Sequence, residues 1–193
     1  MKTVSQRITS VVLLSLMVLA TQSHHFMSLY HFPPAAFAVM FLGGFFLKRP
    51  AWFIYFILLI ALIDGLTISL GAALGAYFSW SYLFMVPAYG VLWSAGYWAE
   101  RQKKLGLVQQ LTATLIGFLS IFIAEAMASG SFYVMKTPLP HSAIGFMNYY
   151  LTWSYQSIDS FLFWALPVMF VYYAVRAVGG VMQNNHRQDG IKP

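Results

Sequence analysis

Three acidic residues lie inside long apolar runs of the sequence, namely Asp64, Glu125 and Asp159. A carboxylate in hydrocarbon is costly unless it is paired, protonated or wet. Two interpretations stay open: the acids line a polar cavity open to one side of a membrane, or they are protonated groups that hydrogen-bond between helices. A relay of protons or cations is a third, although no basic residue lies mid-membrane to pair with the acids.

Histidine and cysteine are the next residues to consider, because they ligate metals. Adjacent side chains such as His24 and His25 point about 100° apart on a helix, which does not match the i, i+4 pair of zinc sites. We therefore expect no dedicated metal site, and we expect these histidines to pack at an interface or to hydrogen-bond a ligand. The chain has no cysteine, which excludes disulfides, thiolate metal sites and cysteine nucleophiles.

Motifs for catalysis or nucleotide binding are absent from the sequence. It contains neither a Walker A motif nor GxGxxG, so we expect the chain not to hydrolyse ATP itself. Ser129 and His141 do not make a convincing serine–histidine catalytic pair, because no geometry that would orient them can be argued from the sequence. The sequence also lacks the histidine boxes of membrane di-iron enzymes. The sequence therefore predicts a protein that is not an enzyme and that uses no cofactor.

The composition indicates the environment that holds these residues. Of 193 residues, 60% are hydrophobic, 18% are aromatic and only 8% are charged, whereas soluble domains have about 25% charged residues. This excludes an ordinary soluble enzyme, and disorder is excluded by the high hydrophobicity. The apolar runs are continuous rather than alternating, which favours helices over a membrane β-barrel. We predict an all-α integral membrane protein.

The apolar runs predict a six-helix bundle that forms a single transmembrane domain over residues 1–193. The second run is short and starts with Pro33 and Pro34. The first run could instead be a signal peptide, which would leave five spans. Longer segments follow the first, third and fifth runs, at 22–32, 71–80 and 129–151. The six predicted spans are 7–21, 33–47, 51–70, 81–99, 105–128 and 152–178.

Basic residues predict the orientation of this bundle. With six spans, ten of the 11 Lys and Arg residues fall on one side, and Lys136 falls on the other. The side rich in Lys and Arg is normally cytoplasmic, so we expect both termini in the cytoplasm. The net charge of +6 is then an orientation signal, and it requires no nucleic-acid partner. The expected environment of the chain is the lipid bilayer.

Several strings in the first half resemble a known family. They are His24-His25-Phe26, Tyr30-His31-Phe32-Pro33, the run 38–47, and Pro87-Ala88-Tyr89-Gly90-Val91-Leu92-Trp93. Together they resemble the substrate-binding (S) components of energy-coupling-factor vitamin transporters, in particular the solitary cobalamin-specific branch of proteobacteria. The resemblance covers mainly residues 20–100, and Asp64 falls where that branch commonly has an acid.

The resemblance implies a function and a location. The chain would bind a vitamin, most readily cobalamin or a related corrinoid, in a cavity open to the periplasm, and would take it up across the bacterial inner membrane. The vitamin would be a transported ligand and not a cofactor. An ATP-hydrolysing energising module with its own transmembrane subunit would be the partner. The first span lacks the Ala-x-x-x-Ala pattern with which related components contact that partner, so function as a solitary protein stays open.

One departure from the family concerns the cobalt. Members of that branch carry a cysteine in the second outer segment that ligates cobalt, whereas this chain reads Tyr77-Phe78-Ser79-Trp80-Ser81-Tyr82 there. Three alternatives follow: the corrinoid binds without that bond, His25 or His31 replaces the cysteine, or the substrate differs. The residues expected to bind the substrate are His25, Phe26, Tyr30, His31, Asp64, Tyr77, Ser79, Tyr82, Tyr89, Asn148, Trp153 and Asp159.

Two other functions fit the same sequence. The first is a small proton- or cation-coupled transporter that uses the acids within the apolar runs. The second is a membrane subunit that does not itself transport, or an enzyme acting within the membrane.

Overall fold

The computed structural model describes residues 4–22, 33–69, 80–102, 107–138 and 141–189. Within these ranges every regular element is a helix and none is a strand, so the predicted all-α class is confirmed for this part of the chain. The elements are α1 (Val4–Gln22), α2 (Ala36–Phe46), α3 (Pro50–Ser69), the 3₁₀ helix η1 (Trp80–Phe84), α5 (Met85–Arg101), α6 (Leu107–Lys136) and α7 (Ala143–Asp189).

Four of these helices are long and apolar enough to cross a membrane: α1, α3, α6 and α7. Their outward faces carry large apolar side chains; Leu62, Leu111 and Phe170, for example, are between 60% and 75% exposed. Such faces are stable against lipid and costly in water. By the length and composition of its helices, the chain is a multi-pass membrane protein.

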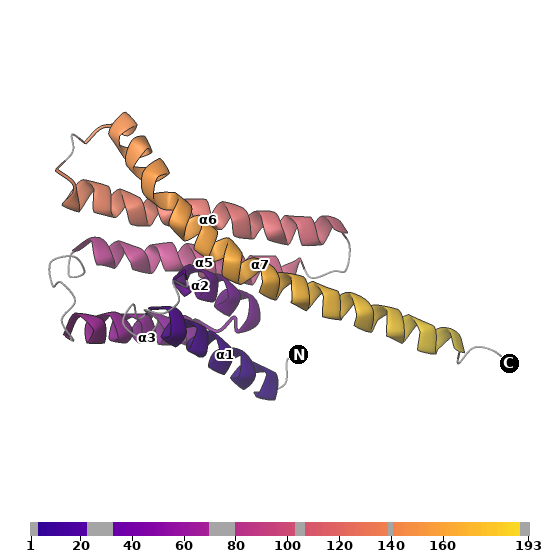
Figure 1. The fold of residues 1–193 in the computed structure, drawn as a ribbon. Helices are drawn as coiled ribbons and strands as arrows, with labels where there is room; N and C mark the ends of the chain where they lie inside the picture. The colour runs from indigo at the N-terminus through magenta and orange to yellow at the C-terminus, as the bar shows by residue number, and fades with distance from the viewer. Residues whose placement is uncertain (1–3, 23–32, 70–79, 103–106, 139–140, 190–193) are drawn as a thin grey trace.

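The helices alternate in direction through the bundle. Figure 1 shows α5 and α6 as antiparallel neighbours, with α7 crossing α6 and α2, and with α1 and α3 on the far side of α2. The C-terminal ends of α2 and α5 and the N-terminal ends of α1, α3 and α6 lie toward one end of the bundle (Figure 1). We call this the basic end, because Lys48, Arg49 and Arg101 lie there; Lys136 lies at the opposite end.

Helix α2 forms the centre of the bundle. All of its residues from Ala38 to Phe45 are buried. Its 11 residues span about 16 Å, roughly half of a hydrocarbon core. The helix is therefore shorter than the predicted span 33–47, and Pro33 and Pro34 precede it instead of forming its first turn. Proline disfavours the helical conformation in the residue that precedes it, so Pro34 keeps Pro33 out of the helix. The carbonyl of Pro33 instead accepts a 2.8 Å hydrogen bond from the indole of Trp164.

Two glycines allow α2 and α5 to approach each other closely. A Cβ atom on Gly44 would overlap the backbone carbonyl of Trp93, and one on Gly96 would overlap the carbonyl of Phe41. Backbone contact of this kind requires residues without side chains, as in other membrane helix pairs. The glycine-rich end of α2 is thus explained by packing.

Helices α6 and α7 extend further than the predicted spans. α6 continues to Lys136 and α7 begins at Ala143, so most of the predicted loop 129–151 is helical. The hydroxyl of Ser142 accepts a 3.0 Å hydrogen bond from the backbone N–H of Gly145, which caps the first turn of α7. Hydropathy alone missed these helical ends because they carry Ser, Tyr and Asn.

Candidate functional site

The structure describes the surroundings of five of the residues predicted to bind a substrate: Asp64, Tyr89, Asn148, Trp153 and Asp159. The backbone of Tyr82 lies in η1, but its side chain is outside the described part. The remaining candidates also fall outside the described residues; they are His25, Phe26, Tyr30, His31, Tyr77 and Ser79.

Asp64 and Tyr89 are brought together with Gln22 toward the end opposite the basic end. The amide of Gln22, the last residue of α1, donates a 3.1 Å hydrogen bond to Oδ1 of Asp64 on α3. The Tyr89 hydroxyl on α5 is close enough to the Asp64 carboxylate to interact with it electrostatically. The Tyr89 ring is buried and packs edge-on against Phe37 at 5.8 Å between ring centroids. Three helices thus converge on one carboxylate.

The side-chain oxygen of Gln22 is not satisfied by the hydrogen bond that its amide N–H donates to Asp64. Its Oε1 is buried and has no hydrogen-bond partner among the described residues. The neighbouring Thr21 is fully engaged: its hydroxyl donates to the carbonyl of Met17 at 2.8 Å and accepts from the backbone N–H of Ala35 at 3.0 Å. A buried acceptor without a donor is unfavourable, and this makes Gln22 a candidate acceptor for a ligand donor.

Glu125 forms a separate polar group between α6 and α7. Its side chain is buried, and the hydroxyl of Ser129, one turn along α6, donates to Oε1 at 2.6 Å. Ser157 on α7 also hydrogen-bonds the Glu125 carboxylate. The phenols of Tyr149 and Tyr150 are near enough to interact with its charge. Among the described residues, the groups that act on Glu125 are hydroxyl groups, and no Lys or Arg pairs with it.

The three remaining candidates lie on the exposed face of α7. Asn148 and Asp159 are exposed, and Trp153 is 54% exposed. The Trp153 ring continues a row of aromatic side chains, since it lies 6.4 Å from Tyr149, which lies 5.6 Å from Tyr133 on α6. These contacts suit an aromatic belt at a membrane interface as well as a stacking surface for a ligand.

The three acids within the apolar runs are thus in three different settings. Asp64 accepts from an amide, Glu125 accepts from two hydroxyl groups, and Asp159 is exposed on α7. In the part of the chain that the structure describes, no group of three His, Asp or Glu side chains could hold a metal ion.

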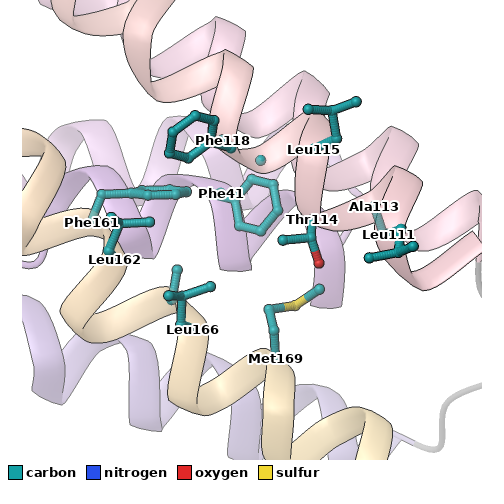
Figure 2. Close-up of a pocket in the computed structure, with 12 residues that line it drawn as sticks. Phe41, Leu111, Ala113, Thr114, Leu115, Phe118, Phe161, Leu162, Leu166 and Met169 are labelled. Carbon is teal, nitrogen blue, oxygen red and sulfur yellow. The ribbon is translucent and has the colours of Figure 1, made fainter. Parts of the chain in front are cut away.

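An apolar groove lies between α6 and α7, with Phe41 of α2 at its floor (Figure 2). Its volume is about 420 Å³. Of its lining side chains only Thr114 is polar, and that hydroxyl donates to the carbonyl of Gln110 in its own helix at 3.0 Å. The groove therefore offers hydrocarbon contacts and no hydrogen-bonding partner, unlike the polar cavity that the acids predict.

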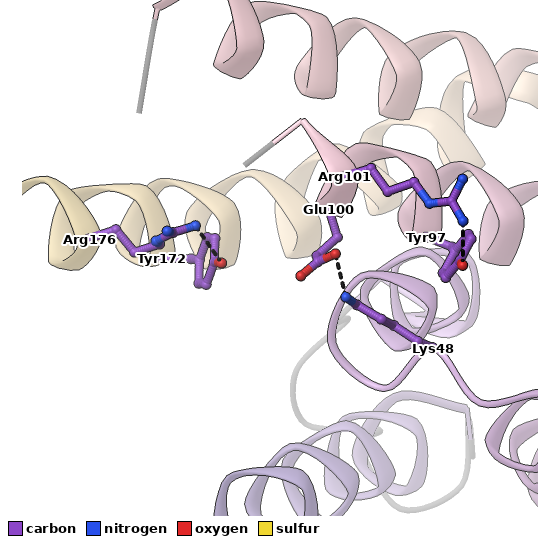
Figure 3. Close-up of polar contacts among 6 residues, drawn as sticks. All are labelled: Lys48, Tyr97, Glu100, Arg101, Tyr172 and Arg176. Carbon is purple, nitrogen blue, oxygen red and sulfur yellow. Dashed lines mark hydrogen bonds and ion pairs between the residues drawn. The ribbon is translucent and has the colours of Figure 1, made fainter. Parts of the chain in front are cut away.

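The basic end is fixed by polar contacts (Figure 3). Lys48 and Glu100 form an ion pair between the segment after α2 and the end of α5. Arg101 donates a 2.6 Å hydrogen bond to the hydroxyl of Tyr97. Arg176 on α7 donates to the hydroxyl of Tyr172 at 3.3 Å. Glu100 is the acid among these charged side chains, so the end keeps an excess of positive charge.

No protein-family model matches the chain, and no curated protein is significantly similar to it. What the structure defines is the class: a multi-pass helical membrane protein. It has a buried central helix, a basic end and polar groups embedded among its helices.

Sequence reasoning missed three residues of these polar groups. Gln22 falls in the predicted outer segment 22–32, and the predicted site includes neither Ser129 nor Ser157. The spacing of four residues between Glu125 and Ser129 places both side chains on one helix face, so that contact could have been found. The contacts of Gln22 and Ser157 depend on how separate helices pack, and no local pattern encodes them.

Proposed function

We propose that the protein binds a vitamin at the end of the bundle opposite the basic end and takes it up across the bacterial inner membrane. The proposed substrate is cobalamin or a related corrinoid. The convergence of Gln22, Asp64 and Tyr89 from three helices carries this proposal. It brings a carboxylate and an unpartnered amide oxygen together, with the buried phenol of Tyr89 within electrostatic range of the carboxylate. Corrinoids present amide groups around a large ring, and such amides donate to carboxylate and amide oxygens.

The position of α2 supports the same proposal. Its C-terminal end lies at the basic end, because Lys48 pairs with Glu100 there. Since α2 is about 16 Å long, it spans roughly half of a hydrocarbon core. A ligand bound beyond its N-terminal end would lie above the buried apolar residues of α2, near Asp64 and Tyr89.

The proposed orientation follows from the charges. We assign the basic end to the cytoplasm, because Lys and Arg accumulate on the cytoplasmic side of membrane proteins. The Asp64 group then faces the periplasm, and both termini lie in the cytoplasm, as the six-span prediction requires. In this orientation the chain crosses back over the membrane between the end of α1 and the start of α3. Helix α2 provides about half of the length of that crossing.

The cobalt has no cysteine ligand, because the chain contains none. We propose that binding relies on the amide, ring and nucleotide groups of the corrinoid. A cobalt–imidazole bond to His25 or His31 is the alternative within the same function. An ATP-hydrolysing module with its own transmembrane subunit would energise uptake, and co-purification with the tagged chain from its own cells would detect that partner.

Uptake of radiolabelled cobalamin by cells lacking their own cobalamin transporter tests this function. Expression of the protein should give uptake above the empty-vector level, and Asp64→Asn should reduce the initial rate by about tenfold, the cost of one charged hydrogen bond. Asp189→Asn is the matched control, because it removes the same charge near the end of α7. No uptake by the wild-type chain, at equal membrane levels, would refute transport of this substrate.

Glu125 favours a second candidate function, a transporter coupled to protons or cations. A buried carboxyl without a basic partner must bind a proton or a cation, or pay a large penalty. In this case transport should depend on an imposed proton or sodium gradient, and Glu125→Gln should remove that dependence. Asp159→Asn is the comparison, because Asp159 is exposed. Transport that ignores both gradients would eliminate this candidate.

A further inference from the structure

We propose that the groove between α6 and α7 binds an acyl chain of an anionic phospholipid whose headgroup lies against Arg176. This inference needs only that the chain is embedded in a bilayer, and it does not depend on vitamin uptake.

The walls of the groove match an acyl chain. Its volume is about 420 Å³, and Figure 2 shows Leu115 and Phe118 of α6 facing Leu162 and Leu166 of α7 across Phe41. Leu115 and Leu166 are 56% and 48% exposed, so the groove borders the lipid-facing surface. Lipid can therefore reach it from the side of the bundle. An acyl chain is already in hydrocarbon in the bilayer, so van der Waals contacts with these side chains would hold it in the groove.

Charge at the end of α7 indicates the headgroup. Met169 lines the groove, and Arg176 lies seven residues further along α7. Seven residues are two helical turns, so both side chains share one face and are separated by about 10 Å along the axis. Arg176 is the first charged residue of α7 after Asp159, and it lies on the part of α7 toward the basic end. Guanidinium groups bind phosphate with two parallel hydrogen bonds.

The position of the Arg176 guanidinium is restrained. It donates to the Tyr172 hydroxyl at 3.3 Å, and its carbon atom lies 5.7 Å from the centre of the Tyr172 ring. Glu100 at this end is paired with Lys48. Lys and Arg outnumber acids at the basic end, which favours an anionic headgroup over a zwitterionic one, whose own cation offsets its phosphate.

A second copy of the chain fits the groove less well. Membrane helices that pack against each other use small residues at the contact, so that their backbones approach. The rim of this groove carries large side chains instead: Leu111, Leu115, Phe118 and Leu166. A flexible acyl chain can pass between such side chains, whereas a helix cannot approach past them.

Fluorescence quenching in vesicles tests the proposal. Because the chain has no cysteine, Thr114→Cys can be labelled uniquely with bimane inside the groove, and Leu166→Cys gives a second probe from α7. Leu119→Cys is the control, since Leu119 is 53% exposed on α6 and does not line the groove. The quenchers are phosphatidylglycerol and phosphatidylcholine with a nitroxide on the acyl chain.

Both groove probes should be quenched at an about fivefold lower fraction of phosphatidylglycerol than of phosphatidylcholine, the preference expected for one basic side chain at an anionic headgroup. The Leu119 probe should show no preference. Arg176→Gln should abolish the preference, and Arg49→Gln, at the same end, should keep it. Equal quenching by both lipids, or a preference that survives Arg176→Gln, would overturn the proposal. So would groove probes shielded from both lipids, because that result means that a second copy covers the groove.

Discussion

Lys48 and Glu100 form an ion pair that joins the end of the central helix α2 to the end of α5 (Figure 3). The Glu100 side chain is only 6% exposed, whereas that of Lys48 is 37% exposed. Lys48 also has a positive φ of 64°, a conformation that is uncommon outside glycine. This conformation ends α2, where the backbone N–H groups of Leu47 and Lys48 both bond to the carbonyl of Gly43. The ion pair joins that end of the buried helix to α5 at the basic end.

Replacing Lys48 by methionine should destabilise the protein. The change leaves the buried carboxylate of Glu100 without its cation, and we expect a loss of about 1–3 kcal/mol. Thermal unfolding in detergent measures the loss. Adding Glu100→Gln to Lys48→Met should recover part of it, because the unpaired charge is then gone. A double variant as unstable as the sum of the two single variants would show that the pair is not coupled.

Gly96→Ala should destabilise the contact between α5 and α2. A methyl group there would overlap the backbone of Phe41, and overpacking against a backbone costs about 1–3 kcal/mol. Gly65→Ala on α3 is the control, since its added methyl group would meet no atom within 4 Å. That control should be neutral or slightly stabilising, because alanine favours helices. Equal melting temperatures for the two variants would contradict the close approach of α2 and α5.

Ser129→Ala should cost about 1–2 kcal/mol, because it removes a hydrogen-bond donor from the buried Glu125 carboxylate. Ser120→Ala is the matched control on the same helix. The Ser120 hydroxyl donates to the carbonyl of Gly117. Losing that hydrogen bond leaves no charged group without a donor. Unfolding of both variants in detergent should therefore separate them, with the Ser129 variant melting first. The reverse order would mean that Glu125 does not depend on this hydroxyl.

Gln22→Leu should weaken corrinoid binding without removing the fold. The change deletes both the amide that donates to Asp64 and the unpartnered Oε1, and we expect an about tenfold rise in Kd. Gln110→Leu is the control, because Gln110 lies near the start of α6, toward the basic end. Equilibrium titration of purified protein by absorbance gives both values. An unchanged Kd for the Gln22 variant would exclude Gln22 from the binding site.

Much of the fold follows from local sequence properties. Apolar runs without charges predict helices, and each predicted span overlaps a helix of the structure. The length of α2 is harder to predict, because the residues from 33 to 47 are uniformly apolar and hydropathy does not show that the helix starts only after Pro33 and Pro34. The extension of α6 and α7 into the predicted loop 129–151 was missed, since polar residues there lower the hydropathy without ending the helices.

The candidate site was less predictable than the fold. A charged residue in an apolar run is conspicuous, so Asp64 and Glu125 were found from the sequence. Their partners Gln22 and Ser157 come from other helices, and their contacts depend on how those helices rotate and cross. Asp159 shares the sequence signature of the other two acids but is exposed, which hydropathy alone cannot distinguish.

The absorbance spectrum of protein purified from corrinoid-fed cells shows whether the protein binds a corrinoid. A bound corrinoid is coloured, and its band positions report the axial ligand of the cobalt. We expect corrinoid bands that co-purify with the wild-type protein, without a thiolate ligand, and that weaken in Asp64→Asn. A colourless protein that also fails to bind added cobalamin would contradict it.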